Sequence, residues 1–221
     1  MLKAEHISRT FSSGKRRVTA VTDASLTLAA GELAAIVGRS GSGKSTLLNM
    51  LGGLLKPDTG DVRLGSVSLN SLSDAELSAL RGRKIGFVPQ GGSLLSSLSV
   101  FENLSLPFAI LKEQRNVEQR ARELLEQMHI GHLLNAYPAE ISGGEARRAA
   151  IARALMPNPE FLLADEPTSD LDDENTRDVI ALLADIAKCG TGVLFVTHDR
   201  EAAAAAVTLY RMNAGQIEQT R

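Results

Sequence analysis

The feature that most constrains the fold is a glycine-rich segment at residues 38–45, GRSGSGKS, which fits the pattern G-x-x-x-x-G-K-[ST] in full. The apolar run Leu33–Val37 precedes it. Glycines let backbone N–H groups close around phosphate oxygens, and a helix N-terminus favours negative charge. The sequence therefore predicts a strand, a phosphate-binding loop and a helix, the helix being indicated by the spacing of Leu47, Leu48, Leu51, Leu54 and Leu55.

Two more short apolar runs, at residues 161–164 and 193–196, are each followed at once by polar residues. Apolar runs that are bounded by turn signals and separated by helical stretches are typical of buried strands in a parallel sheet. In such sheets ligands lie beyond the carboxyl ends of the strands. We therefore predict an α/β fold with a P-loop nucleotide-binding core.

The remaining sequence predicts two further parts. Residues 19–29 and 61–69 alternate between apolar and polar side chains, as strands with one face in water do. From about residue 93 to residue 154 the pattern is helical, most clearly at residues 117–128. We expect an N-terminal sheet and an inserted helical segment that returns to the core.

The composition excludes several classes of protein. The chain has 221 residues, 43% of them hydrophobic and 23% charged, with a net charge of -2, which gives no sign of a nucleic-acid binder. Its single cysteine, Cys189, excludes an intrachain disulfide framework and fits a reducing compartment. No stretch approaches the roughly 18 apolar residues of a membrane span, and the apolar run 202–207 predicts a short helix. If membranes matter to this chain, they matter through a partner.

Two adjacent carboxylates, Asp165 and Glu166, follow the apolar run at residues 161–164. Successive side chains of a strand point to opposite sides, so the two groups can do different work. Asp165 suits the Mg²⁺ shell of a P-loop enzyme, and Glu166 could orient or deprotonate an attacking water. The other interpretation is a solvated strand end.

A second glycine-rich segment, ISGGE at residues 141–145, has two interpretations. Ser142 and Glu145 have the spacing of a helix capping box, as do Ser73 and Glu76. Between Ser73 and Glu76, however, lie Asp and Ala, whereas the segment at 142–145 contains two glycines, which disfavour a helix. Glycines suit an anion that must approach the backbone closely. Capping and anion binding can coexist, but capping does not explain the glycine pair.

These motifs together resemble the ATP-binding-cassette (ABC) ATPases. Residues 141–145 resemble the LSGGQ signature of that family, and the motifs occur in the family's order over nearly the whole chain. They are the adenine-stacking aromatic (Phe11), Walker A (38–46), the Q-loop (Gln90), the signature, Walker B (161–166), the D-loop (169–172) and the switch histidine (His198).

The resemblance implies a P-loop core with an N-terminal antiparallel β subdomain and an inserted helical subdomain. It implies one ABC ATPase domain over residues 1–221, with 1–90 and 155–221 forming the β subdomain and the core. Residues from about 91 to 154 would form the helical subdomain that carries the signature.

In the family two cassettes face each other, and each ATP lies between Walker A of one copy and the signature of the other. The resemblance thus implies a homodimer that hydrolyses ATP with Mg²⁺ and closes and reopens as it does so. The implied catalytic residues are Glu166, His198 and Gln90, and the implied Mg²⁺ ligands are Ser45, Gln90 and Asp165. The implied ATP contacts are Phe11, Gly38, Ser40, Gly41, Ser42, Gly43, Lys44, Ser45 and Thr46 in one copy and Ser142, Gly143, Gly144 and Glu145 in the opposing copy.

Local stretches resemble the LolD/MacB/FtsE branch of bacterial cassettes, which pair with permeases that extract lipoproteins, expel compounds or transmit force. This implies an integral-membrane permease as partner, no nucleic acid, and a peripheral location on the cytoplasmic face of the bacterial inner membrane. The stretches are residues 9–14, 48–54 and 102–107. The apolar residues 94–108 are either part of the groove that receives the permease or core of the helical subdomain.

The chain departs from the commonest family pattern at several positions. Glu145 stands where Gln is usual, and we expect it to turn back as the capping partner. Phe11 replaces a commoner Tyr, Asp170 stands where a small residue is frequent, and Arg147 stands where Gln is usual.

Two functions of other classes remain as alternatives. A soluble cassette that acts on nucleic acid or ribosomes would lack a permease, and the net charge argues against it. A small-molecule kinase on a P-loop fold would leave the signature and His198 unexplained.

Overall fold

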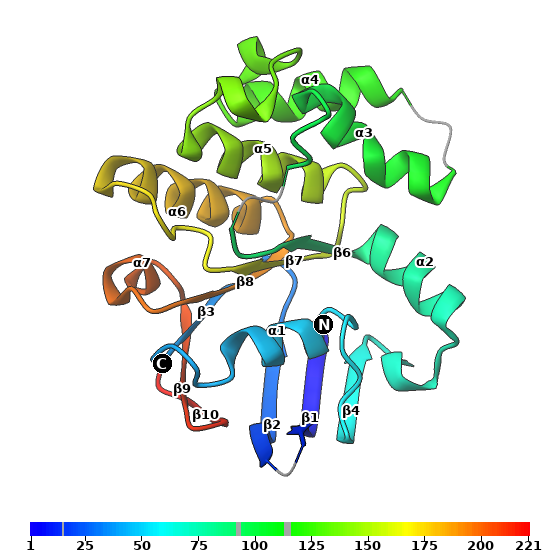
Figure 1. The fold of residues 1–221 in the computed structure, drawn as a ribbon, viewed down its shortest axis with the longest axis vertical. Coiled ribbons are helices and arrows are strands. Elements are labelled where there is room, and N and C mark those ends of the chain that lie inside the picture. Colours follow the sequence, from blue (N-terminus) through cyan, green and yellow to red (C-terminus); the bar gives the residue numbers. More distant parts are fainter. Residues whose placement is uncertain (15, 92–93, 113–115) are drawn as a thin grey trace.

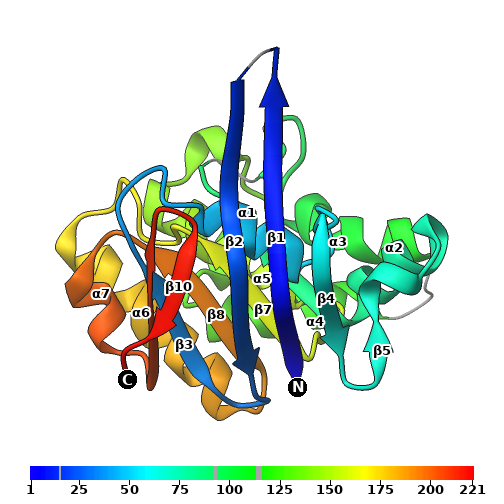
Figure 2. The ribbon, with the colours of Figure 1, turned by 90° about the horizontal axis from the view of Figure 1, so that it is seen from below.

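Two β-sheets and the helices around them make up the architecture of the computed structural model, which describes residues 1–14, 16–91, 94–112 and 116–221 (Figure 1). The first sheet is antiparallel with strand order β2-β1-β4-β5, and β1 and β2 form a long hairpin (Figure 2). Its strands are β1 (Leu2–Ser13), β2 (Arg16–Leu28), β4 (Thr59–Leu64) and β5 (Val67–Ser68).

One prediction about this sheet is wrong. Residues 61–69 were expected to form a single strand, but the chain turns back after Leu64, where Gly65 has a φ of 60°. Leu69 then begins a short 3₁₀ helix, Leu69–Ser71, and its side chain is buried. Apolar and polar residues alternate on both sides of a tight hairpin, so the period-2 pattern alone does not reveal the turn.

The second sheet has strand order β10-β9-β3-β8-β7-β6. The four strands β3, β8, β7 and β6 are parallel neighbours, so their carboxyl ends share one edge. The three apolar runs lie in β3, β7 and β8, as predicted. The strands are β3 (Leu33–Val37), β6 (Ile85–Val88), β7 (Phe161–Asp165), β8 (Gly192–Thr197), β9 (Thr208–Asn213) and β10 (Gln216–Gln219).

Alternation along these strands builds two cores, one on each face of the second sheet. In β3, Ala34 and Ile36 join the core that contains α1 (Lys44–Leu51) and the first sheet. Leu33 and Ala35 join the core that contains the helices after β6. The α1 helix thus lies between the two sheets, which holds the phosphate loop at its start (Figure 1).

The helices other than α1 mostly match the sequence pattern. The amphipathic run 117–128 forms α4, with Ala121, Leu124 and Leu125 buried. Two predicted helices are shorter than expected, because α1 ends before Leu54 and Leu55 and the helix expected at 202–207 ends at Ala204. The bounds are α2 (Asp74–Lys84), α3 (Val100–Leu111), α4 (Val117–Gln127), α5 (Gly143–Leu155), α6 (Asp173–Lys188) and α7 (Arg200–Ala204).

The α5 helix connects the helical end of the molecule to the second sheet. It packs against α3 and α4 on one side and against α6 and β6 on the other (Figure 1). The α5 helix therefore links the segment at its first turn to the second sheet through direct packing. Among the helices in the described ranges, none combines the length and apolarity that a membrane crossing needs.

Candidate functional site

The phosphate loop is fixed by both sheets. Gly43 has a φ of 107° and lies so close to the carbonyl oxygen of Ala20 in β2 that a Cβ atom there would overlap it. On the other side, the Gly215 N–H donates to the carbonyl oxygen of Ser42 at 3.0 Å. Glycine at position 43 is therefore required by conformation and by packing together.

The Lys44 ammonium is buried at the centre of the loop, with 6% of its side chain exposed. Its Nζ donates to the carbonyl oxygens of Gly38 at 2.8 Å and Arg39 at 3.3 Å, and lies 3.5 Å from Glu166 Oε1. A buried charge requires partners of this kind because it has lost its water. Ser42 Oγ is also buried and has no hydrogen-bond partner among the described residues. The loop thus offers a cation and an unused hydroxyl, as a phosphate site does.

Asp165 ends β7 beside this loop. It accepts a hydrogen bond from Ser45 Oγ at 3.1 Å. Burial raises the pKa of the Asp165 carboxyl above its usual value, and the charge of Glu166 adds to this, while Ser45 and Lys44 oppose it. Oxygen donors such as a carboxylate and a hydroxyl suit Mg²⁺, which keeps several waters and substrate oxygens as further ligands. In the described ranges no cluster of three or more His, Cys, Asp or Glu could hold a metal. The residues present therefore fit a Mg²⁺ ion that is shared with phosphate.

Glu166 lies next to Lys44 and is held from two directions. Its Oε2 is 2.9 Å from His198 Nδ1, and its backbone N–H donates to the Val196 carbonyl oxygen at 3.0 Å. Its φ of 47° lies in the left-handed region, which non-glycine residues rarely adopt. By contrast, 68% of the His198 side chain is exposed, so the ring can reach a ligand from solvent.

Two other residues predicted to act with Lys44 are Gln90 and Phe11. Gln90 follows β6, the neighbour of β7, and is exposed at the same sheet edge. Phe11 lies on β1 opposite Val18, and its ring is partly exposed. The guanidinium of Arg9 lies 5.2 Å from the Phe11 ring centroid. One face of the ring is therefore covered by a cation, while the ring remains open to a planar ligand.

The signature segment lies apart from this cluster, at the start of α5. Ser142 Oγ accepts from the Glu145 N–H at 3.3 Å, and Glu145 Oε2 accepts from the Ser142 N–H at 2.8 Å, so the predicted capping box is confirmed. The box at Ser73 and Glu76 is confirmed as well. The hydrogen bonds from Ser142 lower the pKa of Glu145, which keeps that carboxylate ionised and directed at its own helix.

The two glycines of the signature have different surroundings. A Cβ atom at Gly144 would overlap Asn175 Oδ1 of α6, so any larger residue there would displace the Asn175 side chain, which gives a packing reason for glycine within the chain. At Gly143 the nearest atom to such a Cβ would be Leu171 Cδ2 at 3.8 Å, an ordinary contact. At Gly143 packing within the chain gives no reason for glycine, so close approach of an anion is the explanation that remains.

One chain thus brings together Lys44, Ser45, Asp165, Glu166 and His198 at the carboxyl ends of β3, β7 and β8. A buried cation, a carboxylate suited to a metal and a carboxylate beside a histidine are the groups that phosphoryl transfer to water needs. The signature segment shares none of these contacts.

The contacts of two arginines were not predicted from the sequence. Arg9 donates to Asp58 Oδ1 at 2.7 Å while covering Phe11, and its position two residues before Phe11 in a strand could have indicated this. Arg147 of α5 is buried with 8% exposure and donates to Ser169 Oγ at 3.4 Å. Nothing in the local pattern indicates that contact.

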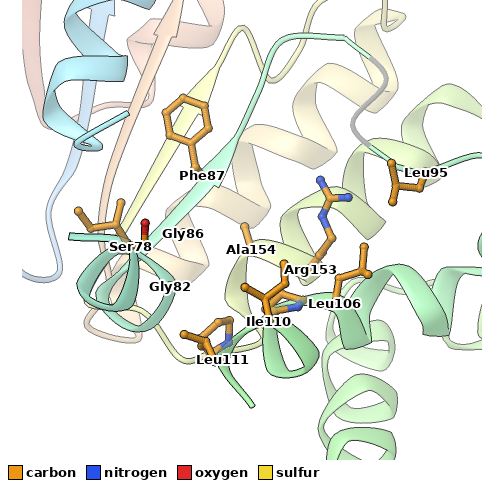
Figure 3. A pocket seen from close by; sticks show the side chains of 13 residues that line it. Ser78, Gly82, Gly86, Phe87, Leu95, Leu106, Ile110, Leu111, Arg153 and Ala154 are labelled. Carbon is orange, nitrogen blue, oxygen red and sulfur yellow. The ribbon is translucent and has the colours of Figure 1, made fainter. Parts of the chain in front are cut away.

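An apolar groove lies on another face, between α2, β6, α3 and α5 (Figure 3). Its volume is about 390 Å³. Ile110 is 77% exposed and Leu95 51% exposed at its margin, and Arg153 adds a positive charge. The predicted apolar stretch 94–108 is therefore divided, because Val100, Leu104 and Phe108 are core whereas Leu95, Leu106 and Pro107 line the groove.

Comparisons with known proteins agree with this geometry. The sequence profile of the family described as "ABC transporter" matches residues 21–169. The lipoprotein-releasing system ATP-binding protein LolD of Bordetella pertussis is 41% identical over 219 residues, covering 98% of this chain and 95% of that protein. The dimeric structure of MJ0796, a bacterial ABC transporter cassette, matches with a TM-score of 0.91 and 35% identity, covering 100% of this chain and 99% of that chain. A post-hydrolysis state of MJ0796 bound to ADP and Pi matches with the same values. The predicted resemblance to the LolD branch is confirmed.

Replacement of Asp165 by Asn should stabilise the protein measured without nucleotide or metal. The change removes a buried charge whose pKa is raised, and it ends the repulsion with Glu166. We expect a gain of about 1 kcal/mol, or roughly 2–4 °C in Tm for a chain of this size, at pH 7.5. The gain should shrink as the pH falls toward the raised pKa, because Asp165 then becomes neutral in the wild type too.

Thermal unfolding of both proteins from pH 7.5 to pH 5 measures this difference. A variant that is less stable than the wild type at pH 7.5 would contradict the assignment of Asp165 as an electrostatically costly group.

Proposed function

This chain belongs to the ABC transporter family and is an ATP-binding, ATP-hydrolysing cassette, and from that premise we propose that two copies close around two ATP molecules to drive a separate permease. We propose that two copies pair because the residues suited to phosphate fall into two groups that do not contact each other within one chain. Lys44 and its neighbours form one group, and the open Gly143 beside Ser142 belongs to another. A second copy lets the two groups meet on the same ATP.

We assign the chemical roles from the contacts around Lys44. Lys44 neutralises the β- and γ-phosphates, and the loop glycines direct N–H groups at them. Ser45, Asp165 and Gln90 are the side chains that would hold Mg²⁺, which when bound neutralises charge on the phosphates. Phe11, backed by Arg9, offers its ring to adenine.

Glu166 and His198 act on the water that attacks the γ-phosphate. The Glu166 carboxylate accepts a proton from that water, and its buried position beside Lys44 keeps it oriented. His198 holds the other carboxylate oxygen through Nδ1 and presents its exposed ring to the phosphate. In the opposing copy, Ser142 and the backbone at Gly143 contact the γ-phosphate, and Gly144 and Glu145 support that turn.

Replacement of Glu166 by Gln should leave ATP binding intact and slow hydrolysis by at least about 100-fold, because an amide cannot accept the proton. Gln keeps the size of the side chain and an oxygen for Lys44. The closed pair should then accumulate with ATP, as measured by size-exclusion chromatography beside phosphate release. Glu160→Gln is the matched control, because Glu160 precedes the same strand and is paired with Lys84 at the surface. Normal turnover by the Glu166 variant would remove this residue from the proposed role.

A mixture of two inactive variants tests whether the site is shared. Lys44→Ala disables the phosphate loop, and Gly143→Asp places a negative charge in the opposing half. Position 143 is preferable to 144, because a side chain at 144 would overlap Asn175 of its own chain. Each variant alone should be inactive, whereas their heterodimer has one site with both halves intact. ATP hydrolysis should therefore appear only on mixing.

The control mixture combines Lys44→Ala with Glu166→Gln. Both changes lie in the same half of the site, so every site of this heterodimer is defective and no activity should return. An inactive Lys44→Ala and Gly143→Asp mixture, with both proteins folded, would contradict the shared site.

The permease partner is proposed to dock in the apolar groove of Figure 3. Exposed Ile110 and Leu95 fit an apolar helix, and Arg153 fits a carboxylate on it. Relatives described as the ATP-binding protein LolD of a lipoprotein-releasing system support a partner within such a system. The proposal places the cassette beside this permease, on the cytoplasmic face of the bacterial inner membrane. In this arrangement α3, α4 and α5 act as the helical subdomain, about residues 91–154, that carries both the groove and the signature.

Ile110→Glu should abolish binding to inverted inner-membrane vesicles without changing ATP hydrolysis of the free protein. A charge in an apolar contact loses its water without gaining a partner. Val207→Glu is the matched control, because Val207 is 71% exposed and lies after α7, away from the groove. Co-sedimentation with native and protease-treated vesicles measures the binding. Equal binding of both variants, or binding to vesicles of lipid alone, would contradict docking of a membrane protein in the groove.

A further inference from the structure

Arg147 has no part in the roles proposed above for ATP binding, hydrolysis and permease docking. It lies on α5, one turn after the signature, and it is 8% exposed. Its Nη2 donates to Ser169 Oγ at 3.4 Å, while its Nη1 has no hydrogen-bond partner among the described residues. A guanidinium has five donors and always carries charge, so burial with one weak hydrogen bond is costly. Such a group calls for an explanation.

The Arg147 side chain borders a cavity of about 290 Å³ between α5 and the segment that follows Glu166. Gly143, Ser169, Asp170 and Leu171 also line this cavity. Burial lowers the pKa of Arg147, and the negative charge of Asp170 opposes that shift. Arg147 and Asp170 are also two of the positions at which this chain departs from the commonest family pattern. The fold thus places two unusual residues of opposite charge around one cavity.

The segment 166–170 is strained at both ends. Glu166 has a φ of 47° and Asp170 a φ of 62°, both in the left-handed region. Non-glycine residues keep such conformations only where the surroundings fix them. Within the segment, the Ser169 N–H donates to the Glu166 carbonyl oxygen at 3.1 Å. A group that holds Ser169 therefore also acts on the backbone of Glu166.

We propose that Arg147 is a positioning residue for ATP hydrolysis: it holds residues 166–170 against α5 and so sets the Glu166 carboxylate from the helix that begins at Ser142. The contact runs from Arg147 to Ser169, and from the Ser169 N–H to Glu166. Nη1 has no partner among the described residues, and Asp170 lines the same cavity, so the proposal includes an ion pair between Arg147 and Asp170. A phosphate that engages Ser142 then affects the hydrolytic carboxylate of the same chain. This proposal rests on the role proposed for Glu166.

Arg147→Gln tests the proposal when kcat and the KM for ATP are measured separately. The variant loses the charge and the reach to Ser169, so kcat should fall about tenfold while the KM for ATP stays within about twofold. Arg147→Lys keeps the charge and should recover part of kcat. Asp170→Ala should lower kcat in the same direction, and its exposed site makes misfolding of that variant a lesser concern. The double variant Arg147→Gln with Asp170→Ala should be no slower than Arg147→Gln alone, because the two act through one contact.

The matched control is Arg120→Gln. Arg120 is a partly buried arginine of α4 that donates to the Leu155 carbonyl oxygen of α5 at 3.4 Å, far along the helix from Ser142. This variant likewise removes a guanidinium that contacts α5, but it should leave kcat unchanged. The proposal is overturned if Arg147→Gln has normal kcat, if it changes KM alone, if the losses of the double variant multiply, or if Arg120→Gln slows turnover equally.

The Glu166→Gln variant distinguishes a failure of the role proposed for Arg147 from a failure of the role proposed for Glu166. Normal turnover of Glu166→Gln would remove the role of Glu166, whatever Arg147 does. Slow turnover of Glu166→Gln with normal turnover of Arg147→Gln would overturn the role of Arg147 alone.

Discussion

The structure is organised around a buried ammonium group whose partners come both from its own loop and from a segment distant in sequence. Lys44 Nζ is held by the Gly38 carbonyl oxygen at 2.8 Å and lies 3.5 Å from Glu166 Oε1, and Glu166 in turn contacts His198 at 2.9 Å. These groups come from three strands that are distant in sequence. Because a buried charge needs partners, the contacts of Lys44 are complete only where the segments that follow β3, β7 and β8 lie side by side. The site therefore depends on the sheet.

The same constraint explains the position of α1. The loop must present Lys44 at the carboxyl edge of the second sheet, while Gly43 must approach β2 of the first sheet. A helix between the two sheets meets both requirements, and its leucines bury against both. The first sheet thus supports the phosphate loop through the packing of Gly43 against β2.

Local patterns predicted much of this arrangement, and long-range packing accounts for what they missed. The strands β3, β7 and β8 and the capping boxes at Ser73 and Ser142 follow from patterns a few residues long. The turn at Gly65 and the early end of α7 at Ala204 do not, because apolar residues continue through both. The contact between Arg147 and Ser169 joins elements whose pairing is fixed only by the whole sheet. The sequence also assigned both signature glycines to an anion, although Gly144 has a reason within its own chain.

The two signature glycines differ in whether packing within the chain explains them. Gly144 lies against the Asn175 side chain, which gives a packing reason for glycine that does not involve a partner. Gly143 has room for a methyl group, and its position in the first turn of a helix costs stability relative to alanine. A residue that lowers stability without a packing reason is explained by contact with something outside the chain. The open side of α5 at Gly143 is consequently the strongest structural argument that the phosphate site of this cassette is completed by another molecule.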